Sequence, residues 1–194
     1  MMNSQIDKEG HLGFVDLVLN AFAFLVNLQF SIVRRTATFV RFENNAIFIN
    51  IYHGRSSYLV GLEIGRIGFS ELYSFYEVLN CVAPDETEKA RCQALTYDVL
   101  ERCLTEIAST LAVNCRNLLL GDDNAFQALR LTALDLRKET TLQAQFGGKI
   151  DQADKAWEDK QYGKAAELYK GAEPALDKTR RRRLAYLNKK LLSI

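Results

Sequence analysis

The sequence predicts an α+β fold, in which an N-terminal helix and a three-stranded antiparallel β-meander precede an all-helical remainder. Apolar and polar residues alternate within residues 36–64, and two turn signals divide this segment into strands. After this segment, apolar residues recur at helical spacings of three and four toward the C-terminus. Strands gathered in one stretch and helices in another are typical of α+β proteins.

A strongly apolar segment, residues 12–30, precedes the predicted strands. Asp16, Asn20 and Asn27 fall on one stripe of a helix, and these polar side chains would be costly inside a lipid bilayer. We therefore expect a helix that packs on the sheet, and no membrane partner. Residues 1–11 lack the basic start of a signal peptide, which predicts a cytoplasmic protein.

Two turns define the predicted meander. A hairpin turn at Asn44–Asn45 pairs Val40 with Ile49, and a second turn at Gly54–Arg55 pairs Ile49 with Val60. Both registers point the alternate residues of the middle strand to the same side, as a one-sided antiparallel sheet requires. We expect the N-terminal helix to cover this face, which is formed by Ile47, Ile49 and Ile51.

Two helices are predicted directly after the sheet. Ser70 is a plausible N-cap for the first, which runs to about Val82. Asp85, with Glu88 three residues later, resembles a capping box for the second. Apolar residues at steps of three and four extend that helix over about residues 85–120, so we expect a long central helix.

A further helix is predicted after the acidic pair Asp122–Asp123, which can cap its first turn. Gly147–Gly148 interrupts the helical pattern, and we expect a flexible joint there. The sequence therefore predicts two domains. The α+β domain spans residues 1–146, and a helical hairpin with a capping helix spans residues 149–194.

The cysteines are widely spaced and have no histidine nearby, which is poor spacing for a zinc site. They are Cys81, Cys92, Cys103 and Cys115. Three of them fall in the predicted central helix, where they cannot bridge each other easily. We expect four free, mostly buried thiols in a reducing compartment, and neither a metal nor any other cofactor.

No catalytic motif is evident, so we predict no catalytic residue, and enzymatic activity is left open but not favoured. The glycines of residues 61–68 lack the spacing of a dinucleotide or phosphate loop. His53 falls at a predicted turn, where a solvated side chain is expected rather than a general base. The formal net charge of +1 gives no global attraction for nucleic acid.

Residues 149–177 resemble a tetratricopeptide-type helical hairpin, with small and aromatic residues at the packing positions. These are Ala153, Trp157, Tyr162, Ala165, Tyr169 and Ala172. Pro174 and Asp177 depart from the pattern of the family. One such repeat cannot bury its own face, so the resemblance implies packing against the rest of the chain, a second copy in a homodimer, or a partner. The helix that follows, with Leu184 and Leu187, could cap the hairpin.

The second face of the meander mixes arginines and aromatic residues, which are enriched at protein interfaces. Candidate partner-binding residues on it are Arg35, Phe39, Arg41, Phe48 and Tyr52. The alternative is a second face that a later helix half covers. Arg180 and Arg181 belong to a run of four arginines and are also candidates, although the run can instead compensate nearby acidic residues or contact nucleic acid.

The combination of a helix, the meander and a helical remainder over residues 12–120 resembles small bacterial immunity-type proteins found beside polymorphic toxins. This resemblance implies a cytosolic, non-enzymatic module that binds a cognate toxin. The alternative hypothesis is a small-ligand binder or an enzyme with a site between the sheet and the long helix. A protein partner is the expectation that we carry forward.

Overall fold

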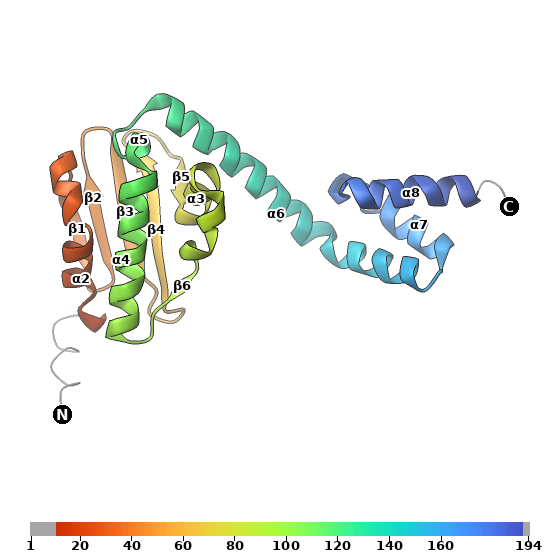
Figure 1. Cartoon of the computed structure of the whole chain (residues 1–194), viewed down its shortest axis with the longest axis horizontal. Coiled ribbons are helices and arrows are strands. Elements are labelled where there is room, and N and C mark those ends of the chain that lie inside the picture. The colour runs from red at the N-terminus through yellow and green to blue at the C-terminus, as the bar shows by residue number, and fades with distance from the viewer. Residues whose placement is uncertain (1–10, 192–194) are drawn as a thin grey trace. The chain divides into compact units, whose positions relative to one another are not determined.

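The computed structural model describes residues 11–191, and its contacts divide the chain into two units, Met1–Ala133 and Leu134–Ile194. The first unit combines an antiparallel sheet with helices, and the described part of the second unit is helical (Figure 1). The predicted α+β fold is therefore confirmed. The division falls at Ala133, earlier than the glycine pair at which the sequence placed it.

Within the described residues, six strands form one antiparallel sheet, where three were predicted. Their order is β1 (Ser31–Thr36), β2 (Phe39–Glu43), β3 (Ile47–His53), β4 (Leu59–Arg66) and β5 (Leu72–Ser74), and β6 (Cys92–Gln93) also pairs with β4. Strands β2 to β4 are the predicted meander. Strand β1 was missed because all six of its residues are exposed, so it lacks an alternating pattern.

The predicted hairpin registers are wrong, but the face that they assign to the isoleucines is right. Val40 pairs with Ile51 rather than Ile49, and Ile49 pairs with Ile64 rather than Val60. Side chains alternate with a period of two, and both registers shift by an even number of residues, so the side chains of β2, β3 and β4 stay on their predicted faces. The three isoleucines of β3 are 0% exposed.

Helices α2 (Phe14–Ala21) and α4 (Tyr97–Asn114) cover the isoleucine face of the sheet (Figure 1). The N-terminal helix thus lies where it was expected, although it is shorter. A 3-10 turn, η1 (His11–Gly13), precedes it, and the 3-10 helix η2 (Ala23–Leu28) follows it. Apolar residues of both helices and of β3 share one buried core.

Ser74, rather than Ser70, is the N-cap of helix α3 (Phe75–Val82). The Ser74 hydroxyl accepts a hydrogen bond from the Glu77 N–H at 3.3 Å, and the Glu77 carboxylate accepts one from the Ser74 N–H at 2.8 Å. This reciprocal capping box satisfies two backbone donors at the helix start. The residues predicted for its first turn form β5, which pairs with β4.

The prediction of one central helix over residues 85–120 is wrong, because part of this segment forms a strand that pairs with the sheet. The segment contains the 3-10 helix η3 (Pro84–Ala90), strand β6, α4 and the short α5 (Arg116–Leu119). The Ala94 N–H donates to the Tyr58 carbonyl at 2.8 Å, and Ala94 is completely buried. Sheet pairing and burial therefore outweigh the helical spacing of the sequence here.

Gly147–Gly148 forms no joint, because both glycines lie inside the 36-residue helix α6 (Asp123–Glu158). Each glycine costs a helix only about 1 kcal/mol relative to alanine, and long helical segments on both sides can offset this cost. The predicted start of the helix is confirmed. The Asp122 carboxylate accepts a hydrogen bond from the Ala125 N–H at 2.8 Å.

The second unit has its own core, formed by the end of α6, α7 (Tyr162–Lys170) and α8 (Lys178–Leu191), with the 3-10 turn η4 (Glu173–Ala175) before α8. Ala153, Ala165, Tyr169 and Ala172, expected at packing positions, are each 0% exposed. Leu184 and Leu187 of α8 also belong to this core, so α8 caps the hairpin as expected. The resemblance to tetratricopeptide repeats stays a prediction.

Cys92 and Cys103 form a disulfide, so the expectation of four free thiols is wrong. That expectation placed both cysteines in one helix, whereas Cys92 lies on β6 and Cys103 on α4, with their Cα atoms 6.1 Å apart. Cys81 and Cys115 are free. Burial, together with the nearby Cys81, raises the pKa of the Cys115 thiol to about 12.

His53 is buried rather than solvated, which corrects another expectation. It is 2% exposed, and its Nε2 donates to the Ala94 carbonyl over 2.8 Å. This hydrogen bond connects the end of β3 to the residue that follows β6.

None of the described helices combines the length and the apolarity that crossing a bilayer requires.

Candidate functional site

The side of the sheet opposite α2 and α4 is the strongest candidate for a functional surface. No described helix of the first unit covers it (Figure 1). The strand registers place the following residues on this side, which we call the open sheet face: Arg34, Thr36, Phe39, Arg41, Glu43, Phe48, Asn50, Tyr52 and Glu63. Most of them are half-buried, so a broad mixed surface is presented to solvent.

Two glycines of β4 allow the aromatic rings of β3 to lie across the sheet. A Cβ atom on Gly61 would lie 2.2 Å from the Tyr52 ring, and one on Gly65 would lie 2.3 Å from the Phe48 ring. Neither position can hold a side chain unless the ring moves. Cross-strand packing of aromatic rings on glycines therefore flattens this part of the open sheet face.

Arginines cover two of the aromatic rings on the open sheet face. The Arg41 guanidinium lies 3.8 Å from the Phe48 ring centroid, and the Arg34 guanidinium lies 5.5 Å from that of Phe39. Arg41 also forms an ion pair with Glu43. These contacts hold the cations in place, and Phe39, Arg41 and Phe48 each remain partly exposed.

A polar row crosses the centre of the open sheet face, in which Arg34, Arg41, Asn50 and Glu63 are successive cross-strand neighbours. Asn50 is 8% exposed, and its Nδ2 donates to the Glu63 carboxylate over 3.2 Å. Its Oδ1 is buried with no hydrogen-bond partner among the described residues. A buried acceptor without a partner costs about 1–3 kcal/mol.

Tyr52 lies beside this row, and its phenol is held in the neutral form. Burial, and to a smaller extent the negative charge of Glu63, raises the pKa of Tyr52 above its usual value. The hydroxyl therefore stays protonated at neutral pH and can donate a hydrogen bond to a partner. This side chain adds a polar group to an otherwise aromatic part of the open sheet face.

Arg34, rather than the predicted Arg35, belongs to the open sheet face. Arg35 was predicted on the same face as Phe39 and Arg41 by continuing their alternation toward the N-terminus, but Ala37 and Thr38 form a turn between β1 and β2 that interrupts it. Arg34 is thus opposite Arg41, while Arg35 is opposite the buried Val40 and shares the side of the core. The other candidates on this surface, Phe39, Arg41, Phe48 and Tyr52, are brought together as expected.

Arg180 and Arg181, the remaining candidates, lie on α8 of the second unit and differ from each other. Arg180 forms ion pairs with Asp154 and Asp177, each at 2.8 Å, and Arg183 binds Asp154 at 3.0 Å. This agrees with the alternative that the arginine run compensates nearby acidic residues. Arg181 is exposed.

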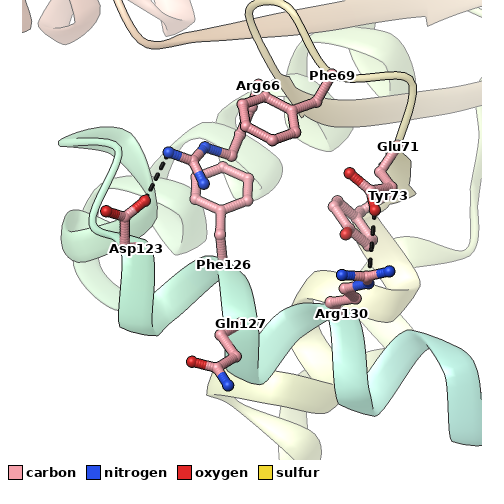
Figure 2. A pocket seen from close by; sticks show the side chains of 8 residues that line it. All are labelled: Arg66, Phe69, Glu71, Tyr73, Asp123, Phe126, Gln127 and Arg130. Carbon is pink, nitrogen blue, oxygen red and sulfur yellow. Dashed lines mark hydrogen bonds and ion pairs between the residues drawn. The ribbon is translucent and has the colours of Figure 1, made fainter.

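A pocket of about 250 Å³ lies between the segment that joins β4 to β5 and the first turns of α6 (Figure 2). Arg66 contacts Asp123 at 2.6 Å, and Arg130 lies 3.5 Å from Glu71. Each arginine is thus neutralised by a carboxylate of the opposite element, so the pocket has no net charge to attract a ligand. We interpret it as a structural contact that holds the β4–β5 loop against α6. Arg66 and Asp123 are 57 residues apart in the sequence, so this contact could not be predicted from local patterns.

The layer between the sheet and α4, where the alternative hypothesis placed a ligand, is filled with apolar side chains. Ile51 and Ile64 from the sheet and Leu100 and Leu104 from α4 are each 0% exposed. Among the described residues, no group of three or more histidine, cysteine or acidic side chains is arranged to hold a metal ion. The open sheet face therefore remains the leading candidate.

Comparisons with known proteins add no further assignment, because the chain matches no family model, no curated protein and no solved structure.

Proposed function

We propose that this chain is a non-enzymatic protein-binding module that engages a partner protein through the open sheet face. The observation that carries the proposal is the uncovered sheet side on which Arg34 and Arg41 stack on aromatic rings. Arginine and aromatic residues are over-represented among interface hot spots, because aromatic rings bury a large area with little loss of conformational entropy and the planar guanidinium offers several hydrogen-bond donors.

The buried Asn50 Oδ1 supports the same proposal. It lies in the middle of the open sheet face with no hydrogen-bond partner among the described residues, between Arg41 and Glu63. Because this oxygen is itself shielded from solvent, a partner can supply a donor only if the Asn50 amide turns outward, and that contact would then remove a free-energy penalty present in the unbound chain. Such gains add to affinity without requiring a large interface.

Affinity capture from the native cells tests the proposal. The tagged chain should recover one protein at equimolar amounts, and Arg41→Glu should reduce its recovery at least about tenfold, as expected when a central interface charge is reversed. Arg102→Glu is the matched control, since Arg102 is exposed on α4, on the covered side of the sheet. Failure to capture any protein, or equal loss in both variants, would contradict the proposal.

The narrower form of the proposal is an immunity-type protein whose partner is a cognate toxin. Co-expression tests it directly. The wild-type chain should restore growth of cells that produce the captured partner, and Arg41→Glu should fail to do so. If the captured partner is harmless to cells, the chain is still a protein-binding module, but the proposed immunity role is contradicted.

The proposed compartment is the cytoplasm, and the Cys92–Cys103 disulfide makes this testable. Disulfides persist mainly in oxidising compartments, whereas cytoplasmic thiols are kept reduced. In a reducing cytoplasm the Cys92–Cys103 bond of the structure would be opened, so alkylation of intact cells, followed by mass spectrometry, should find these two cysteines reduced in the cell. Recovery of the oxidised pair from freshly quenched cells would argue for export or for a redox role of the pair.

A further inference from the structure

Strand β1 is an edge strand of the sheet and borders the open sheet face. Among the described residues, β1 pairs only with β2, so the other edge of the strand is unpaired. All six residues of β1 are exposed, including the apolar Ile32 and Val33, which are 42% and 50% exposed. At the opposite end of the sheet, β5 and β6 have only three and two residues, so β1 is the longer edge.

An unpaired edge strand can accept an extended segment, whose backbone then continues the hydrogen-bonded ladder. The charges of β1 determine which segment fits. Arg34 and Arg35 form no ion pair with any described residue, and they lie on opposite sides of the sheet. A segment with acidic side chains on both of its faces would neutralise the two arginines simultaneously.

The same charges oppose pairing with a second copy of the chain. In a two-fold antiparallel pairing of β1 with itself, arginines of the two copies would be opposite or diagonal neighbours, and like charges there are destabilising. An irregularity in the pairing with β2, between Ile32 and Arg34, further restricts unspecific pairing at this edge. Charge complementarity therefore selects an acidic partner over self-association.

We propose that β1 accepts an extended acidic segment of the partner protein as an added strand along Ser31–Thr36. This inference rests on the proposed function, and it specifies how the partner is held. Acidic residues of the segment lie beside Arg34 and Arg35, and apolar residues lie beside Ile32 and Val33. The added strand extends the open sheet face, so a single partner can occupy the edge and the face together.

A direct probe is a synthetic peptide of about ten residues in which two glutamates are followed by two valines in repetition. Adjacent glutamates point to opposite faces of a strand, and strands commonly have lengths in this range. We expect it to bind the full-length chain in fluorescence anisotropy, and a peptide with lysine in place of glutamate not to bind. Amide hydrogen exchange of residues 31–36 should slow on binding. No binding of the acidic peptide at about 1 mM, a concentration that detects even weak complexes, would overturn the proposal.

Backbone methylation separates strand addition from simple charge attraction. Two versions of the acidic peptide are methylated on the backbone nitrogens of odd or even residues, so that each retains hydrogen-bond donors along only one edge. The proposal predicts that one version binds like the parent peptide and that the other loses binding. Equal binding of both versions would show that charge alone holds the peptide and would overturn the added strand.

Variants of the neighbouring arginines distinguish the edge from the face. Arg34→Glu and Arg35→Glu should each weaken peptide binding by up to about fivefold, as expected for the loss of an exposed charge pair. Thermal melting by circular dichroism confirms that both variants are folded. If only Arg34→Glu has an effect, the peptide binds the open sheet face alone, and strand addition is overturned.

The outcomes also separate this inference from the proposed function. A native partner that is captured and lost with Arg41→Glu, but retained with Arg35→Glu and without slower exchange at residues 31–36, supports the module and refutes the added strand. Capture of no partner refutes the function itself. A concentration-dependent dimer that Arg35→Glu strengthens would identify a second copy as the occupant and overturn the acidic one.

Discussion

At the scale of single residues, the glycines of β4 make the open sheet face possible. Gly61 has no room for a Cβ atom, because the Tyr52 ring lies 2.2 Å from where that atom would be. The sequence could not reveal this requirement, since a glycine in a strand also fits a bulge or a turn. Tyr52 therefore lies on the face where it was predicted, but the glycine that supports its ring was not identified from the sequence.

We predict that Gly61→Ala displaces the Tyr52 ring and lowers the free energy of unfolding by about 1–3 kcal/mol, the usual cost of overpacking. Chemical denaturation followed by far-ultraviolet circular dichroism measures the change. Gly163→Ala is the control, because a Cβ atom there meets nothing within 4 Å, so this helical substitution should leave the stability unchanged or raise it slightly. An unchanged stability of Gly61→Ala would mean that the ring is not packed on this glycine.

In the second unit, Asp154 is the centre of a hydrogen-bond network. It accepts hydrogen bonds from Tyr169 at 2.6 Å and from Arg180 and Arg183. Burial acts to raise the pKa of Asp154, but the hydrogen bonds of Arg180 and Tyr169 and the charges of both arginines outweigh it and lower the pKa. A lowered pKa in the folded chain means that the stabilisation is present above about pH 4, the unfolded pKa of aspartate, and is lost as the pH falls through the folded pKa.

We therefore predict that the second unit becomes less stable below about pH 4 and that Asp154→Asn is destabilised at pH 7, with a smaller loss on acidification. Trp157 is the only tryptophan of the chain and contacts Tyr162 and Tyr186, so its fluorescence reports on this unit. The Asp177 pKa is also lowered, chiefly by a hydrogen bond with Arg180, so some acid sensitivity should persist in the variant. Identical pH profiles of the two proteins would contradict this role of Asp154.

At the scale of elements, the helices and strands that were predicted correctly are those for which a local pattern and the tertiary context agree. The meander, the covering N-terminal helix and the α8 cap follow from apolar periodicity, and all three are present. The β3 isoleucines were placed on the correct side of the sheet although the predicted strand pairings were wrong. This is because the observed pairings differ from the predicted ones by an even number of residues. Arg35 was misplaced because the turn at Ala37–Thr38 contains neither glycine nor proline.

The failures at this scale have a common cause, since long-range pairing overrides local helical spacing. Residues 92–94 belong to the stretch 85–120 that has helical periodicity, but they pair with β4 and Tyr58, which no local pattern encodes. The Cys92–Cys103 disulfide was missed for the same reason, because it joins β6 to α4. Conversely, Gly147–Gly148 looked like a break, but helix-forming residues on both sides carry α6 through it.

The continuity of α6 leads to a prediction about Gly148. A Cβ atom on this glycine would meet nothing within 4 Å, and its φ is not positive, so Gly148→Ala should stabilise the second unit by about 0.5–1 kcal/mol. Denaturation followed by Trp157 fluorescence measures the effect. Destabilisation by alanine would show that the glycine pair is a joint, as the sequence first suggested.

At the scale of the whole molecule, the two units have separate hydrophobic cores, and the proposed activity belongs to the first. The open sheet face and the edge strand β1 both lie in Met1–Ala133, whereas Arg180 of the second unit is engaged with Asp154 and Asp177. The sequence predicted an interaction surface of arginine and aromatic residues, but its extent depends on strand pairings that only the three-dimensional structure provides. A partner should therefore contact the sheet of the first unit.

Site-specific photo-crosslinking tests this claim most directly. A benzophenone amino acid replaces Phe39 on the open sheet face in one protein and Val113, which is 77% exposed on α4, in the control. We predict that, in the native cells, the probe at residue 39 crosslinks to one protein in high yield and that the probe at residue 113 does not. Crosslinking from residue 113 alone, or from neither position, would contradict a binding role for the open sheet face.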